Sequence, residues 1–556
     1  MGATASAHGA RLTPEQRGKL LAALVKLKEG QKAERMTALE GLHGLADDPA
    51  FKTQLGTSRE VLDALAAVLR GGDKDIQQLA ATVCWSLSFG DGNEQAMAAS
   101  PVTEELVQAI VRYSSRRGGG GGGDDALASQ ACATLWNLLT TEDPTNRINL
   151  GAKKLGLLPA VATVLVDPRL PTDLQEKATA VVKFLSLERG NRDYMVSKDL
   201  LIVPKLVPLV SPIGRATPRT QLHALATLVN LSDNPAPEAQ AALAAPGARL
   251  LTALAEVIRY RHAPEADAEA VLYACQAAWN MAEHGTDTSV AFVLPTKLHL
   301  VMIDVVKDAG ADSAAWPSAP HCAEALNFLM NFATHPVGMQ ALRSTDVLKV
   351  LEPPLVRGRG ALNSAVLRAL FIAVFLVGSE EANSNSYSAK LIKNNPQAVD
   401  LLLDVYATAL AGRDGSDYPA GTFCLSLIVH AVSELSETDD VQVMLLAAKG
   451  NVLKLLRQTL HKFAANEPAI DLVGGGGGDM KSAARALQAL LLLSFCRSEA
   501  PAMTAPAGAA GASVARLEML LLALRANLVS RAAAAAGACC PCREASPIHK
   551  CSLSCV

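Results

Sequence analysis

Asparagines at similar positions interrupt several apolar stretches of this chain. Asn230, Asn280 and Asn331 are 50 and 51 residues apart, and Ser86 and Asn137 are also separated by 51. A primary amide both donates and accepts hydrogen bonds, so a row of amides can pair with the backbone of an extended peptide whatever its sequence. Each amide could instead bond a carbonyl of its own turn or of a neighbouring repeat, which would be a structural role.

Patterns typical of catalysis or cofactor binding do not accompany these asparagines. The sequence contains no phosphate-binding loop, dinucleotide fingerprint, zinc-protease motif or nucleophile elbow. The eleven histidines are scattered, and His223, His321 and His430 are interpreted as helix-surface or satisfied core residues rather than ligands. We therefore expect no enzymatic activity, no cofactor and no metal.

The composition is that of a well-packed protein without a strong overall charge. Of the 556 residues, 50% are hydrophobic and 19% are charged, and the formal net charge is −3. This balance gives no field that would attract nucleic acid, so we expect no nucleic-acid partner. The longest apolar run, residues 369–377, is far shorter than the ~20 residues of a membrane-spanning helix, and no signal peptide is recognisable. We expect a cytoplasmic protein.

The apolar stretches belong to a repeat that predicts helices throughout. Each copy has a helix of small and apolar residues, a polar turn, a short connector and a second apolar helix. The clearest copies of the first helix are residues 79–88, 131–140, 177–187, 223–233, 274–283 and 323–333, and weaker copies are 38–47, 365–377, 422–432 and 483–496. Each unit exposes an apolar face that only a neighbour can cover, so about ten repeats should stack into an all-α solenoid. Glycine runs at 116–125 and 474–479 are expected to be inserted loops.

Residues 134–165 closely resemble an armadillo repeat. The pattern is a leucine-rich helix with Asn near its end, an Asn-Arg turn, then Gly, an aliphatic residue, Pro and another leucine-rich helix. It is carried by Asn137, Asn146, Arg147, Gly156, Leu158, Pro159 and Leu165. The resemblance implies an armadillo/HEAT-like right-handed superhelix in which Asn137, Asn230, Asn280 and Asn331, with Ser86, line a concave groove.

The local chemistry is consistent with helices at these places. Pro159 and Pro204 fall at the start of apolar helices, where a missing N–H costs nothing. Gly156 permits a tight corner. Asn146 and Asn191 are expected to cap the helix that follows the turn.

The sequence departs from the nuclear-import adaptors of the armadillo family. Those adaptors carry Trp one turn before the Asn, whereas this chain has Ala133, Ala226, Gln276 and Asn327 there. Three tryptophans, Trp85, Trp136 and Trp279, instead immediately precede Ser86, Asn137 and Asn280. They lie about 100° away around the helix and are expected in the core. A basic nuclear-localisation peptide is therefore not the expected ligand. At these places the repeats of this chain are more similar to those of catenin-like or organelle-adaptor armadillo proteins.

The N-terminal end carries signals for membrane attachment. The residues from Met1 to Ser6 fit the N-myristoylation pattern at Gly2. Thr13 and Gln16 predict a capping box at the start of an amphipathic helix. Residues 11–35 contain seven basic and three acidic side chains, so this helix would cap the solenoid or lie near anionic lipid.

The cysteines fall into two groups. Six occur singly in apolar stretches and are expected to be buried thiols: Cys84, Cys132, Cys275, Cys322, Cys424 and Cys496. The other five lie in the last 18 residues. There Cys539, Cys540 and Cys542 are candidates for S-acylation. Alternatively, zinc could be held by Cys540, Cys542, His549 and Cys551, or the tail could have no role.

Together these patterns predict a non-enzymatic armadillo-repeat scaffold or adaptor that binds protein partners along its groove. The predicted parts are an N-terminal segment with a capping helix (1–33), the solenoid (34–525) and an Ala/Cys-rich tail (526–556). By resemblance to N-myristoylated organelle or vacuole adaptors, the protein could attach to the cytosolic face of a membrane. The alternative is a regulator of an NTPase or chaperone built on the same solenoid. The sequence does not predict the oligomeric state or the partner's identity.

Overall fold

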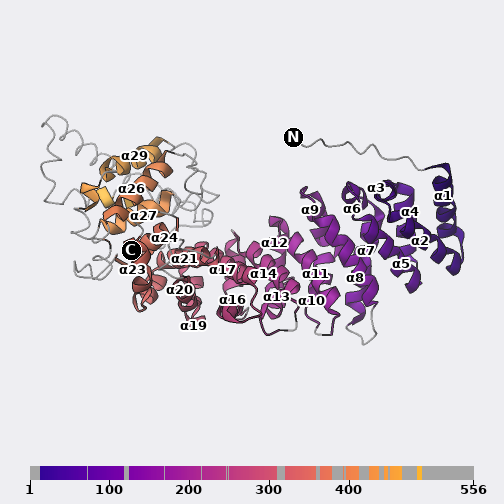
Figure 1. Cartoon of the computed structure of the whole chain (residues 1–556), viewed down its shortest axis with the longest axis horizontal. Helices are drawn as coiled ribbons and strands as arrows, with labels where there is room; N and C mark the ends of the chain where they lie inside the picture. Colours follow the sequence, from indigo (N-terminus) through magenta and orange to yellow (C-terminus); the bar gives the residue numbers. More distant parts are fainter. Residues whose placement is uncertain are drawn as a thin grey trace, which may run out of the picture. The chain divides into compact units, whose positions relative to one another are not determined.

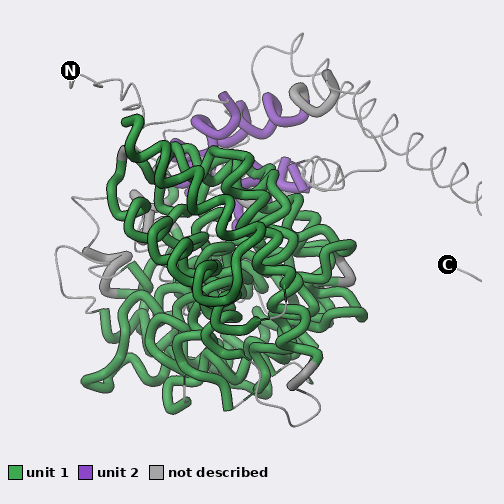
Figure 2. Tube along the Cα trace, turned by 90° about the vertical axis from the view of Figure 1, so that its right-hand side faces the viewer, with its two compact units in different colours: residues 1–378, 385–401 green, residues 379–384, 402–556 purple. Residues whose placement is uncertain are grey.

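The computed structural model describes most of the chain up to residue 490. The described residues are 13–71, 73–117, 124–167, 169–214, 216–233, 235–245, 247, 249–309, 320–357, 364–377, 392, 396–411, 425–436, 444–448, 451–465, 485–486 and 488–490. The chain forms two compact units, residues 1–378 with 385–401 and residues 379–384 with 402–556 (Figure 2). Every regular element within the described ranges is helical, as the repeat predicts.

One row of helices in the first unit carries the predicted asparagines, and we call its members the ladder helices. They are α2 (Lys32–Ala46), α5 (Lys74–Leu87), α8 (Asp125–Leu139), α11 (Thr172–Leu185), α14 (Pro218–Ser232), α17 (Ala268–Glu283), α21 (Pro320–Ala333) and α24 (Ser364–Val377). Each ladder helix packs against the next one in the row, and Figure 1 shows α8, α11, α14, α17 and α21 in this order.

A second row of helices packs alongside the first and is called here the outer row. It consists of α1 (Pro14–Glu29), α4 (Arg59–Arg70), α7 (Pro101–Arg117), α10 (Leu157–Leu165), α13 (Ile202–Val210), α16 (Leu250–Arg259), α20 (Leu298–Asp308) and α23 (Val347–Arg357).

Shorter helices connect the two rows within each repeat. These connecting helices are α3 (Pro49–Thr57), α6 (Asn93–Ala98), α9 (Thr145–Gly151), α12 (Arg189–Val196), α15 (Pro237–Ala244), α18 (Asp287–Ala291) and α22 (Pro336–Arg343), with α19 (Val293–Thr296), η1 (Lys153–Leu155) and η3 (Tyr260–His262) at corners. No single described helix is long and apolar enough to cross a membrane, and the one pair that passes by length and composition, Asp287–Thr296 with Leu298–Asp308, is bent by 71°.

The core of the first unit is built from small and aliphatic side chains. In α4, Val61, Leu65 and Leu69 recur every four residues and are buried, which gives the helix one apolar face. The ladder helices bury alanines such as Ala80 and Ala178, which lets neighbouring helices approach closely. This packing explains why only 4% of the residues are aromatic. The predicted buried thiols Cys84, Cys132, Cys275 and Cys322 are indeed buried, and Cys424 and Cys496 lie outside the described residues.

The corner before four of the outer helices has a left-handed backbone. Gly156 has φ of 72°, and the equivalent residues Leu201, Arg249 and Lys297 have φ of 49°, 56° and 57°. They immediately precede α10, α13, α16 and α20. The tight corner predicted at Gly156 is confirmed, but in three repeats a side chain is held where glycine would be unstrained.

The second unit has fewer described helices. They are α27 (Leu425–Leu435), α29 (Val452–Ala465) and most of α26 (Pro396–Leu410), which begins in the first unit. A hydrogen bond of 2.6 Å between Tyr406 Oη and Thr459 Oγ1 joins α26 to α29, and both side chains are buried.

Candidate protein-binding surface on the ladder helices

The five residues predicted to line a groove all lie near the ends of ladder helices. Ser86 is in α5, Asn137 in α8, Asn230 in α14, Asn280 in α17 and Asn331 in α21. We call their shared place the ladder position, which Phe184 holds in α11. Asn137, Asn230 and Asn331 are half-buried, whereas Ser86 and Asn280 are 8% and 9% exposed. The row therefore exists, but its members differ in accessibility.

Three of the four asparagines bond a serine of the preceding ladder helix. Asn137 Nδ2 donates to Ser88 Oγ at 2.8 Å, and Asn230 Nδ2 donates to Ser186 Oγ at 2.9 Å. Each serine lies two residues after the ladder position of its own helix. Each of these two amides thus uses one N–H to bond the preceding repeat. Its side-chain oxygen and its second N–H remain for a ligand.

Asn280 follows the same pattern with longer bonds. Its Nδ2 lies 3.3 Å from both Ser232 Oγ and the carbonyl oxygen of Val229. Both of these acceptors are in α14. Because its amide already makes two hydrogen bonds and is only slightly exposed, Asn280 is the asparagine of this row least able to bond a partner.

Asn331 differs from the other three asparagines. Ala282 follows the ladder position of the preceding helix by two residues, where the α5, α11 and α14 repeats have Ser88, Ser186 and Ser232. Among the residues that the structure describes, none forms a hydrogen bond with its side-chain amide, and its backbone carbonyl accepts from Thr334. The whole Asn331 amide is therefore available to a partner.

A second row on the ladder helices consists of large side chains one residue before the ladder position. Trp85, Trp136 and Trp279 hold this place in α5, α8 and α17, and Lys183 holds it in α11. All four are half-buried, so the prediction that the tryptophans lie in the core is wrong. The Trp136 side chain reaches past the neighbouring helix α11 to His223 in α14, which the spacing alone does not reveal.

The rings on this surface contact one another across repeats. The Trp136 and His223 ring centroids are 5.6 Å apart with planes at 76°, and Lys183 Nζ lies 5.3 Å from the Phe184 ring centroid. Burial, together with Lys183 and Arg219, lowers the pKa of His223 to about 4. The imidazole is therefore neutral near pH 7.

Among the described cations at this place, Lys183 is the one without a carboxylate partner. Lys177 and Arg219 are paired with Asp173 at 2.8 Å and Glu176 at 3.6 Å. No carboxylate lies within 4.0 Å of Lys183 among the residues that the structure describes. The surface around α11 therefore combines an unpaired ammonium group with aromatic rings.

Solved structures share this arrangement of helices. An engineered protein aligns with 86% of this chain and 99% of its own, with a TM-score of 0.58 and 16% identity. A structure described as "A conserved phosphorylation switch controls the interaction between cadherin and beta-catenin in vitro and in vivo" aligns with 86% of this chain and 82% of its own, with a TM-score of 0.60 and 16% identity. The chain has the armadillo-repeat fold. No sequence-family pattern and no curated protein matches the sequence.

The armadillo Asn-Arg turn has a structural role in this chain. Asn146 Nδ2 donates to the carbonyl oxygen of Leu138 at 2.9 Å, and Asn191 Nδ2 donates to those of Leu185 and Arg147, each at 2.9 Å. These amides bond the C-terminal end of a ladder helix, and both also bond the preceding connecting helix, Asn146 through the carbonyl oxygen of Glu94 at 3.4 Å. The prediction that they cap the following helix is wrong, because each lies inside its own short helix.

The arginine of the same turn pairs with the next armadillo repeat. Arg147 Nε lies 2.8 Å from Glu188 Oε1, and Arg192 Nη1 lies 3.5 Å from Asp233 Oδ2. Both acids are 41 residues after their arginine. The motif that revealed the family resemblance thus stabilises the contacts between repeats and does not build the ligand surface.

The grouping most similar to a catalytic site is Ser129, Asp173 and Lys177. Lys177 Nζ lies 2.8 Å from both Ser129 Oγ and Asp173 Oδ2, and Ser129 also donates to Asp173. Burial raises the pKa of the Asp173 carboxyl, but the hydrogen bonds from Lys177 and Ser129 together outweigh this effect and hold its pKa below the usual value. Lys177 Nζ donates to the oxygens of both Ser129 and Asp173, so it is not placed to accept the proton of Ser129, and the serine is only 7% exposed.

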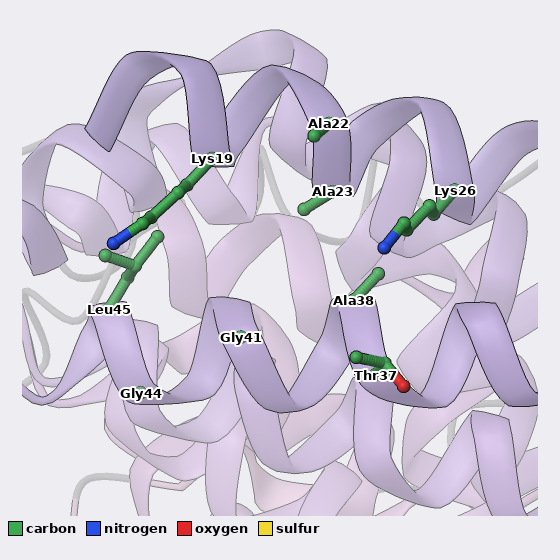
Figure 3. Close-up of a pocket in the computed structure, with 9 residues that line it drawn as sticks. All are labelled: Lys19, Ala22, Ala23, Lys26, Thr37, Ala38, Gly41, Gly44 and Leu45. Atoms are coloured by element: carbon green, nitrogen blue, oxygen red, sulfur yellow. The ribbon is translucent and has the colours of Figure 1, made fainter. Parts of the chain in front are cut away.

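Other candidate sites are weak or lie outside the described residues. A groove of about 370 Å³ between α1 and α2 has a floor of small residues such as Ala23 and Gly41 (Figure 3). No metal-binding cluster occurs in the described part of the chain. The predicted lipidation sites Gly2, Cys539, Cys540 and Cys542 lie outside the described residues.

Proposed function

We propose that this protein is a non-enzymatic scaffold that binds extended segments of protein partners along its ladder helices. The observation that carries the proposal is the row of amides at the ladder position of α8, α14, α17 and α21, with half-buried large side chains beside them on α5, α8, α11 and α17. The free amide of Asn331 can pair with a partner's backbone. The rings and ammonium group around α11 suit a segment that carries an apolar side chain next to a carboxylate. The neighbour named for a cadherin–β-catenin interaction supports the fold of such a scaffold, but not the identity of the partner.

The test begins by identifying partners through proximity labelling and mass spectrometry. Binding of a recovered segment is then measured for Asn331→Ala and for Trp136→Ala with Lys183→Gln. We expect at least tenfold weaker binding for the combined variant, because losing about 1.4 kcal/mol gives a tenfold change. The control is Leu300→Ala on the outer helix α20, where the side chain is 38% exposed. Equal affinities in all the variants would refute the proposal.

The proposal includes a membrane tether through myristoylation of Gly2. A single myristoyl chain binds membranes only marginally, so a second contact is required. Acylation of Cys539, Cys540 or Cys542 would supply it and would be reversed by hydroxylamine, which cleaves thioesters. Mass spectrometry of the N-terminal peptide tests the first modification. An unmodified peptide, with equal membrane fractions for wild type and Gly2→Ala, would exclude the tether.

A further inference from the structure

Helix α1 has two apolar faces, of which only one is used in packing. Leu20, Leu24 and Leu27 are buried, and the helix packs against α2 and α4. On the other side Leu21 is 57% exposed and Val25 is 55% exposed. These two side chains are one turn apart and form a single strip that points away from the solenoid.

Cations border this apolar strip on one side. At 100° per residue, Arg17 and Lys28 lie beside Leu21, whereas Lys19 and Lys26 lie about 120–140° around the helix from the centre of the strip. All four side chains are exposed. Figure 3 shows that Lys19 and Lys26 extend from α1 along the groove toward α2. The outer face therefore has an apolar strip with one positively charged margin, and the other two cations of the helix lie on the side of the groove.

The acidic side chains of α1 do not cancel this charge. Glu15 lies 2.8 Å from Lys19, and the hydrogen bond from Lys19 lowers the pKa of the Glu15 carboxyl. Glu29 is the last residue of the helix. The helix thus has four basic side chains against two acidic ones, which favours a negatively charged partner.

We propose that the outer face of α1 docks on an anionic lipid bilayer. Leu21 and Val25 enter the headgroup region while the flanking cations contact lipid phosphate and carboxylate groups. A specific protein interface needs about 800 Å² on each partner, which two apolar side chains on one straight helix do not supply. A bilayer needs no complementary shape, and each cation near its surface strengthens binding about fivefold. This contact is separate from the partner-binding surface and does not require acylation.

The test uses full-length, unacylated protein and phosphatidylcholine vesicles with or without phosphatidylserine. We expect sedimentation with the anionic vesicles only, and weaker binding as salt is raised. The Leu21→Asn/Val25→Asn variant should bind at least tenfold more weakly, and Lys28→Gln about fivefold more weakly. The matched control is Ile213→Asn, which changes an apolar side chain that is 85% exposed elsewhere. Circular dichroism and melting check that each variant is folded.

Two results would overturn the proposal. One is binding that is absent, or the same for both kinds of vesicle and for all variants. The other is a wild-type dimer that Leu21→Asn/Val25→Asn converts to a monomer without any effect on vesicles, because the strip would then belong to a second copy. Binding of a partner segment by the same variant should be unchanged, so failure here and failure of the proposed scaffold function are distinguishable.

Discussion

The Trp136 and His223 rings meet edge to face, although a complete ladder helix separates the helices that carry them. Trp136 is in α8 and His223 in α14, and α11 packs between these two helices. In α11 the small Ala180 is completely buried, which is consistent with side chains crossing over it. The contact therefore joins three consecutive repeats on the surface proposed for partner binding, where repeat proteins normally contact only their nearest neighbours.

Acid should weaken this part of the solenoid through His223. Its folded-state pKa of about 4 is below the usual histidine value of 6.5, so the unfolded chain binds the proton more readily. Stability is complete above pH 6.5 and falls as the pH drops toward 4. For a half-buried group we expect a loss of about 1–2 kcal/mol between pH 7.5 and pH 5. Hydrogen exchange of residues 218–232 measures it, and His223→Gln should lose less. An equal loss in both proteins would contradict this assignment.

Gly151 is predicted to be irreplaceable because it makes room for Asn191. A Cβ at Gly151 would lie 2.0 Å from Asn191 Oδ1, and the Asn191 amide cannot move without losing its two backbone bonds. Gly151→Ala should cost about 2–3 kcal/mol, measured by thermal or urea unfolding. Gly190→Ala is the control, since nothing lies within 4 Å of a Cβ there. Similar costs for the two substitutions would rule out this reason.

The two inter-repeat ion pairs should differ in strength. Arg147 and Glu188 are largely buried and 2.8 Å apart, whereas Asp233 is 62% exposed and 3.5 Å from Arg192. Glu188→Gln should destabilise by about 1–2 kcal/mol and Asp233→Asn by less than about 0.5 kcal/mol. Urea unfolding at low and high salt measures both. A larger effect of Asp233→Asn would show that exposure does not determine their strength.

The left-handed corners offer a stabilising substitution. Leu201 and Lys297 have positive φ and exposed side chains, so glycine there removes strain with little loss of packing. Lys297→Gly should raise the unfolding free energy by about 0.5–1 kcal/mol, since the left-handed backbone costs roughly 1–2 kcal/mol for a residue with a Cβ. Gly156→Ala should lower it by a similar amount. Melting curves that show the opposite signs would refute the explanation.

The repeat and its fold could be predicted because they follow from local signals. The capping box of Thr13 and Gln16 is present as predicted, and Pro159 lies in the first turn of α10. The strained corner at Lys297 could not be predicted, because packing imposes a conformation that its residue type disfavours.

The candidate surface was predicted less completely than the fold. The asparagine row was recognised from spacing, but its serine partners are 44–49 residues earlier and become visible only when helices are paired. A signal was present, since Ser88 and Ser186 each lie two residues after a ladder position.

Ala282 lies where a serine bonds the ladder asparagine in other repeats, so Asn331 allows a direct test. The test asks whether a ladder amide that bonds the preceding repeat is less able to bind a partner. Ala282 is buried, so a serine there would place its hydroxyl where the other repeats bond an asparagine. Ala282→Ser should stabilise the protein by about 0.5–1.5 kcal/mol, and Asn331→Ala should remove that gain. The same substitution should weaken binding of a partner segment, because one N–H of Asn331 becomes occupied. The Ser232→Ala and Asn280→Ala pair provides a reference coupling energy from a natural bond. If Ala282→Ser instead costs about 1–3 kcal/mol, the buried hydroxyl has found no acceptor, and Asn331 does not lie where the row of serine bonds predicts.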